Sequence, residues 1–293
     1  MDSSAAAAHN NIAIQLVNEN ETEEAERHYL RAIELAQATG STRWEANAHA
    51  NYGRIFFERG DYAQAWEHVM RFRELTRLIG DRRGEATSGV ILCALWTIFG
   101  AIEEIEHELS RVEVEAEETR DRWLSAFVAH RRAWLAEQRG DLDQARAFLE
   151  AATTIRREIN DREGLSVVLQ QSGAIDAAQG EREQAISLLE QALAIEEAEP
   201  DSRLAALCEL AVLMPERVGE ASRALEGMSI DGTVTVHAAW CLWRATGDRA
   251  YLERAHRDLE TVISNVPAEY RSSARTRSRI ARAVTEAWAG TGV

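Results

Sequence analysis

The feature that most constrains this chain is a repeat with a period of 40 residues. A small residue recurs at Ala25, Ala65, Ala145 and Ala185, and Ile105 stands at the remaining step. A large apolar residue follows each of them four positions later, and another small residue precedes each by 12 positions. These two sets are Tyr29, Val69, Leu109, Leu149 and Leu189, and Ala13, Gly53, Cys93, Ala133 and Gly173. Small residues on facing helices let the backbones approach closely, and the large residue fills the space beside them. The pattern predicts a stack of equivalent helical units.

The residues between the apolar patterns follow the same period and predict two turns in each unit. One turn falls at Asn20, Gly60, Gly100, Gly140 and Gly180, and the other at Gly40, Gly80, Arg120, Asn160 and Pro200. Glycine and asparagine suit the left-handed residue that ends a helix, so Arg120 is an exception. Ser41, Asp81, Asp121, Asp161 and Asp201 come next and are predicted to cap the following helix. No strand pattern is found. We therefore expect an all-α solenoid of helix-turn-helix repeats.

The regularity of the pattern divides the chain into three predicted regions. Residues 1–200 hold five regular repeats, residues 201–266 hold two irregular helix pairs that continue the solenoid, and residues 267–293 form a C-terminal capping helix and tail. The last helix is predicted over residues 271–289. We expect it to cap the stack, because a terminal unit exposes one face to water.

This pattern resembles the tetratricopeptide repeat family. The matching residues are Tyr52-Gly53 with Gly60-Asp61-Tyr62 and Ala65, Gly140-Asp141-Leu142 with Ala145, and Gly180-Glu181 with Ala185, Leu189 and Ala192. The usual unit has about 34 residues, and the 40-residue form is similar to that of kinesin light chain and of bacterial regulators such as the maltose activator. The resemblance covers about residues 5–200. It implies a right-handed superhelix that binds peptides or proteins in a concave groove and performs no chemistry.

The resemblance also implies that the first helix of each pair lines this groove. The candidate peptide- or protein-binding residues are then Asn11, Asn47, Asn51, Arg54, Phe57, Phe127, His130, Arg131, Trp134, Gln170 and Gln171. Asn11 and Asn51 lie 40 residues apart, and asparagines at this place in similar members bind the backbone of a peptide. A carboxamide suits that role because it both donates and accepts. The series is interrupted, since Ile91, Arg131 and Gln171 stand at the later steps.

Each candidate also has an interpretation that needs no ligand. An asparagine on a helix is often solvated surface. Phe127 and Trp134 would anchor a peptide if exposed in the groove, and would equally well pack against the next unit.

Charge is distributed unevenly in a chain whose formal net charge is −16. Eight glutamates between residues 103 and 118 are predicted to form a solvated face or a docking patch for a basic partner. A second candidate docking patch consists of Arg271, Arg275, Arg277, Arg279 and Arg282. No aromatic residue interleaves these arginines and the chain is acidic, so no nucleic-acid partner is expected. An acidic protein surface, such as the glutamate-rich helix of a second copy, suits them better, which leaves self-association open.

The residue types that are missing exclude several kinds of site. All 33 basic residues are arginine, which excludes a lysine-containing phosphate loop and a Schiff-base lysine. Cys93, Cys208 and Cys241 are far apart and lie in apolar runs, so they are interpreted as core residues of a chain from a reducing compartment. Histidines recur at the 40-residue period, but stacked units are about 8–10 Å apart, too far for one metal. No catalytic, metal or cofactor site is predicted.

The sequence thus predicts a cytoplasmic, non-catalytic scaffold that binds a protein or peptide. The sequence has no run of about 18 apolar residues, and its first residues lack the basic start and apolar stretch of a signal peptide, so no membrane partner is expected. Three alternatives stay open: the sensory arm of a larger bacterial signalling protein, such as an ATPase, kinase or transcription regulator; a self-associating scaffold; and an enzyme whose site the sequence does not reveal. The sequence also leaves open whether the C-terminal helix occupies the groove.

Overall fold

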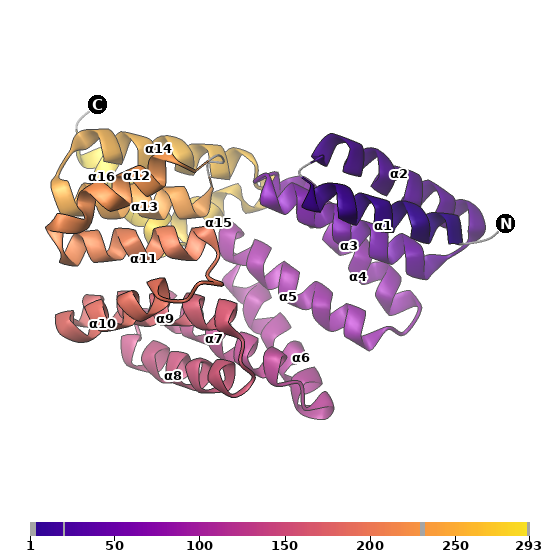
Figure 1. Ribbon diagram of the computed structural model, residues 1–293, viewed down its shortest axis with the longest axis horizontal. Coiled ribbons are helices and arrows are strands. Elements are labelled where there is room, and N and C mark those ends of the chain that lie inside the picture. Colours follow the sequence, from indigo (N-terminus) through magenta and orange to yellow (C-terminus); the bar gives the residue numbers. More distant parts are fainter. Residues whose placement is uncertain (1–3, 20, 229–231, 292–293) are drawn as a thin grey trace. The chain divides into compact units, whose positions relative to one another are not determined.

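A computed structural model describes residues 4–19, 21–228 and 232–291, and every regular element in these ranges is a helix (Figure 1). The α-helices are α1 (Ser4–Asn18), α2 (Thr22–Thr39), α3 (Thr42–Glu58), α4 (Tyr62–Leu78), α5 (Arg82–Phe99), α6 (Ile102–Thr119), α7 (Arg122–Gln138), α8 (Leu142–Glu158), α9 (Arg162–Gln179), α10 (Arg182–Leu193), α11 (Pro200–Leu213), α12 (Val218–Glu226), α13 (Thr233–Thr246), α14 (Arg249–Ser264), α15 (Arg271–Thr276) and α16 (Arg279–Gly290). Short 3-10 helices are η1 (Pro215–Arg217) and η2 (Ala268–Tyr270). The predicted all-α class is confirmed.

Helix boundaries reproduce the period of the sequence. Helices α2, α4, α6, α8 and α10 begin at residues 22, 62, 102, 142 and 182, and α3, α5, α7 and α9 begin at residues 42, 82, 122 and 162. Helices pack in consecutive pairs, with the most extensive contacts in α1–α2, α3–α4, α7–α8 and α9–α10. In the pair α9–α10, a Cβ added at Gly173 would lie 2.6 Å from Cγ of Leu189, so the small and large residues of the pattern meet as expected.

A residue with a left-handed backbone conformation follows a helix at every twentieth position from residue 40 to residue 180. Six are glycines, and the other two are Arg120, with φ of 55°, and Asn160, with φ of 54°. The predicted turn residue Asn20 lies outside the described residues. Pro200 was predicted to serve such a turn, and this is wrong, because it opens α11 as its first residue, where a proline ring suits the helix.

Three of the five predicted N-caps are confirmed. The carboxylates of Asp81, Asp121 and Asp161 accept hydrogen bonds from backbone N–H groups two or three residues later. Ser41 makes no such bond. Asp201 lies inside the first turn of α11, because Pro200 starts that helix one residue earlier.

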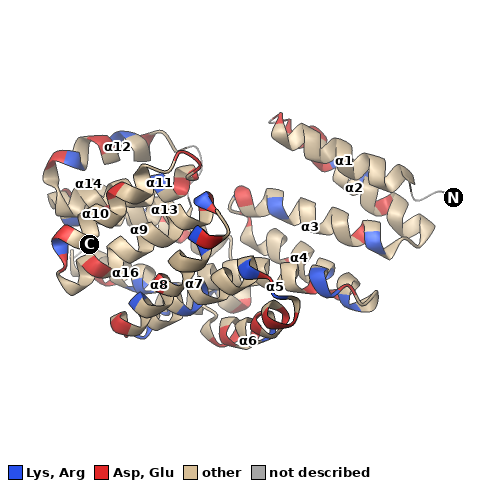
Figure 2. Cartoon of the chain, turned by 60° about the horizontal axis from the view of Figure 1, so that its bottom comes forward, with Lys and Arg blue, Asp and Glu red and all other residues tan. Residues whose placement is uncertain are grey.

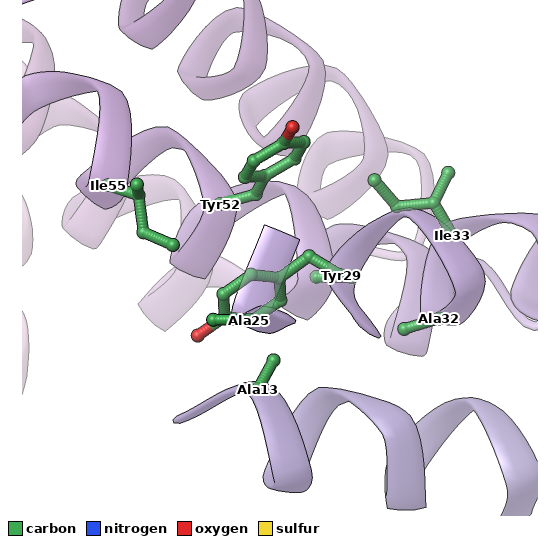
Figure 3. Close-up of a cluster of buried hydrophobic side chains, with 8 residues drawn as sticks. Ala13, Ala25, Tyr29, Ala32, Ile33, Tyr52 and Ile55 are labelled. Carbon is green, nitrogen blue, oxygen red and sulfur yellow. The ribbon is translucent and has the colours of Figure 1, made fainter. Parts of the chain in front are cut away.

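The chain divides into two compact units. Unit 1 comprises residues 1–96 with 265–267, and unit 2 comprises residues 97–264 with 268–293. A core of unit 1 is formed by buried residues of α1, α2 and α3 (Figure 3). These residues are Ala13, Ala25, Tyr29, Ala32, Ile33, Ala48, Tyr52 and Ile55.

The periodic histidines pair across the two helices of a repeat. Nδ1 of His9 lies 3.0 Å from Nδ1 of His28, and the equivalent atoms of His49 and His68 are 2.8 Å apart. Burial, together with the charge of the neighbouring His68, lowers the pKa of His49 to about 4. The pKa of His68 is also lowered by burial. This pair is therefore neutral at pH 7.

The C-terminal segment differs from the single helix that was predicted over residues 271–289. Helix α15 ends at Thr276 and α16 begins at Arg279. Ser278 between them has an extended backbone, with φ of −70° and ψ of 130°, which breaks the helix. Among the described helices, none combines the length and apolar character that a bilayer span requires.

Candidate binding site

Unit 2 contains a cavity of about 480 Å³. Its walls are formed by the first helices of successive pairs, α7, α9, α11 and α13, together with the end of α5, helix α14 and the C-terminal segment. Most of the lining side chains are apolar, among them Ile98, Val167, Val234, Leu259 and Ile280. Arg131, Gln170, Glu199, Asp201 and His237 add polar groups. A cavity of this size that combines apolar walls with polar groups is typical of a ligand site.

The C-terminal segment, residues 268–291, forms one wall of this cavity through Ala274, Ser278, Ile280 and Ala281. It is fixed to α5 and α7 by specific contacts. The ring of Tyr270 stacks on Phe99 with centroids 5.2 Å apart, and the Ser273 hydroxyl donates to the Phe99 carbonyl at 2.7 Å. The backbone N–H of Arg279 donates to Oε1 of Gln138 at 2.8 Å. The C-terminal segment is thus a structural part of the cavity.

Three of the residues that the sequence proposes for the groove line this cavity: Arg131, Trp134 and Gln170. The Arg131 guanidinium lies over the ring of Phe127, 5.4 Å from its centroid. Phe127 is buried and stacks on Trp123 with centroids 6.0 Å apart. It supports Arg131 from the core and does not line the cavity.

The other two candidates in unit 2, His130 and Gln171, are half-buried outside the cavity lining. Burial lowers the pKa of His130 to about 3, and the charges of Arg131 and Arg156 act in the same direction, so the ring is neutral. Gln171 donates through Nε2 to Oε2 of Glu137 at 3.2 Å. Burial raises the pKa of that carboxyl. These groups form hydrogen bonds within the fold.

The remaining candidates belong to unit 1 and line no part of the unit 2 cavity. Asn51 donates through Nδ2 to Oδ1 of Asn10 at 3.0 Å, so its amide bonds to the preceding repeat. Arg54 pairs with Glu58 at 2.9 Å. Phe57 contacts Tyr62 edge to face. Asn11 is exposed and Asn47 is half-buried.

The predicted arginine patch makes contacts inside its own chain. Arg275 pairs with Glu260, Arg277 pairs with Glu103, and Arg279 lies 3.4 Å from Glu137. Arg271 donates to the Ser264 carbonyl at 2.9 Å, and Arg282 is exposed. Glu103 belongs to the glutamate-rich helix α6, whose acidic residues are coloured red in Figure 2. One predicted patch therefore contacts the other within a single chain.

A cluster that the sequence analysis missed is formed by Glu209, His237 and Cys241. Nε2 of His237 lies 3.1 Å from Oε1 of Glu209 and 3.6 Å from Sγ of Cys241. Burial lowers the pKa of His237, but Cys241 and Glu209 outweigh that effect and raise it well above its ordinary value. The sequence pattern that could have revealed part of this cluster is the spacing of four residues between His237 and Cys241, because it places both on one face of a helix.

Comparisons with known proteins give the following matches. The sequence model of the family described as "Tetratricopeptide repeat" matches residues 4–76 and 124–198, together just over half of the chain. No curated protein matches the chain in sequence. The crystal structure of a Rap protein complexed with Competence and Sporulation Factor is similar in fold, with a TM-score of 0.60, 13% identity and 99% of each chain covered.

A second similar structure is a Signal Transduction ATPase with Numerous Domains (STAND) protein with a tetratricopeptide repeat sensor, from Pyrococcus horikoshii. The TM-score is 0.51 at 17% identity, and the match covers 97% of this chain and 44% of that one. At these identities the two structures establish a similarity of fold.

Proposed function

The chain belongs to the tetratricopeptide repeat family, and from that premise we propose that it is a non-catalytic scaffold that binds a protein or peptide segment in the cavity of unit 2. The observation that carries this proposal is the cavity itself, which is lined by the first helices of successive pairs. The Rap protein, which was crystallised with Competence and Sporulation Factor, supports the proposal as a scaffold of similar fold with a bound factor.

The chemistry of the lining suits a peptide segment with apolar side chains. Trp134 offers a large apolar surface of the kind that anchors partners. The amide of Gln170 both donates and accepts, so it is able to pair with a peptide unit whatever its side chain. Arg131 would select a carboxylate, and Glu199 and Asp201 would select a cationic group. The groove candidates of unit 1 remain predictions for a second contact surface.

A peptide selected by phage display against the full chain tests this proposal when its affinity is measured by calorimetry. Trp134→Ala removes the largest apolar side chain that lines the cavity. We expect it to weaken binding about 30-fold, the loss typical of an interface anchor. Val114→Ala is the control that should leave the affinity unchanged, because it removes an exposed apolar side chain of unit 2 that does not line the cavity. Equal affinities of the wild type and both variants would contradict the proposed site.

The second candidate is a regulatory arm of a larger protein, and the match to the STAND protein favours it, since this chain spans 44% of that protein's length. Sequencing the natural gene tests this candidate. If the chain is such an arm, the same reading frame should also encode an ATPase or kinase domain. Self-association has less support, since three of the five arginines of the patch pair with acids of their own chain.

A further inference from the structure

The cluster of Glu209, His237 and Cys241 has a composition that peptide binding does not require. Glu209 comes from α11, whereas His237 and Cys241 come from successive turns of α13. The packing of α11 against α13 brings a carboxylate oxygen, an imidazole nitrogen and a sulfur together. These are the ligand types that Zn²⁺ takes in proteins.

The separations of Nε2 of His237 from the other two ligand atoms are close to the edges of a tetrahedron around such an ion. Zinc bonds of about 2.0–2.1 Å to nitrogen, 2.0–2.2 Å to oxygen and 2.3 Å to sulfur place nitrogen about 3.3 Å from oxygen and about 3.6 Å from sulfur. The observed distances from Nε2 of His237 are 3.1 Å to the Glu209 carboxylate and 3.6 Å to the Cys241 sulfur. All three atoms lie within 4.8 Å of one another.

A metal ion would replace the protons that His237 and Cys241 carry when no metal is bound. Nε2 of His237 faces both the carboxylate and the sulfur, and its single N–H makes one good hydrogen bond at a time. Glu209 is 7% exposed and Cys241 is fully buried. A divalent ion would balance the charges of one carboxylate and one thiolate, and so would offset the cost of burying them.

We infer that Glu209, His237 and Cys241 form a binding site for a divalent metal ion of the zinc type. His237 is also a lining residue of the unit 2 cavity, which gives the ion an entry path. The cavity has room for a fourth ligand, a water molecule or a donor atom of a bound partner. Binding releases the thiol proton of Cys241 and the proton on Nε2 of His237, because the thiolate and the neutral imidazole are the ligands. This inference goes beyond the proposed scaffold function and does not depend on it.

Cobalt titration of the chelator-treated full chain tests the site directly. A bond between Co²⁺ and a thiolate produces a charge-transfer band in the near ultraviolet, and we expect it to saturate at one equivalent and to disappear when Zn²⁺ is added. Cys241→Ser should abolish the band and weaken binding at least about 100-fold, the upper range for the loss of an outer-shell partner. Cys93→Ala, which removes a buried thiol of unit 1, should leave the band and the affinity unchanged.

Circular dichroism reports whether each variant is folded. If Cys241→Ser does not fold, His237→Gln decides the question, because it removes the imidazole ligand and keeps a polar side chain. A loss of Co²⁺ affinity in His237→Gln would support the site, and an unchanged affinity would overturn it. The absence of the band in the wild type, or an equal band in folded Cys241→Ser, would also overturn it.

Discussion

Replacing Gly100 by alanine tests whether the C-terminal segment is seated on the turn between α5 and α6. Gly100 has φ of 64°, and a Cβ at this position would lie 2.5 Å from the carbonyl oxygen of Ser273. The left-handed conformation costs a residue other than glycine about 1–2 kcal/mol. The clash adds about 1–3 kcal/mol, the usual cost of overpacking, because a backbone carbonyl cannot swing away. We therefore expect Gly100→Ala to lower the free energy of unfolding of unit 2 by about 2–5 kcal/mol.

Gly140→Ala is the matched control for this substitution. Gly140 ends α7 with φ of 77°, and a Cβ there would meet nothing within 4 Å, so it should cost only about 1–2 kcal/mol. Urea unfolding followed by far-ultraviolet circular dichroism measures both losses. Equal losses in the two variants would refute the placement of Ser273 against this turn.

Three further predictions concern the repeats themselves. Arg120→Gly should raise the free energy of unfolding by about 1 kcal/mol in urea unfolding, because Arg120 is exposed and adopts a left-handed conformation. Gly173→Ala should lower it by about 1–3 kcal/mol, since the new Cβ would lie 2.6 Å from Cγ of Leu189; an unchanged unfolding midpoint would contradict that packing. The pKa of His49 is lowered to about 4 in the folded chain, so the unfolded chain takes up a proton first as the pH falls. The contribution of His49 to the free energy of unfolding should be constant above pH 6.5. It should decrease by about 2 kcal/mol between pH 6.5 and pH 4, after allowance for solvent screening. Unfolding midpoints across that range should fall less in His49→Gln, and an equal fall would show that the acid sensitivity arises elsewhere.

The repeat architecture could be predicted because its determinants are local in sequence. The left-handed turn residues and the small and large residues such as Gly173 and Leu189 lie within a few tens of positions of each other. They therefore show directly as a period. Pro200 was misassigned because a proline both ends one segment and starts the next helix, and only the backbone shows which role it takes.

The candidate site was less predictable because it depends on how helices from distant repeats are brought together. Arg131, Trp134 and Gln170, which line the cavity, could be chosen by their positions on the first helix of each pair alone. The sequence also did not show that the amide of Asn51, a groove candidate, donates to Asn10 of the preceding repeat. The cluster around His237 was missed because its acid comes from another helix, α11, 28 residues earlier.

Photo-crosslinking of the selected peptide shows most directly whether the first helices of the pairs in unit 2 hold the partner. Benzoylphenylalanine is placed at Gln170, which lines the cavity on α9, or at Gln191, which is exposed on α10, the second helix of the same pair. We expect crosslinks from position 170 and none from position 191. Crosslinks from position 191 alone would place the partner on the second helix of the pair and contradict the proposed binding site.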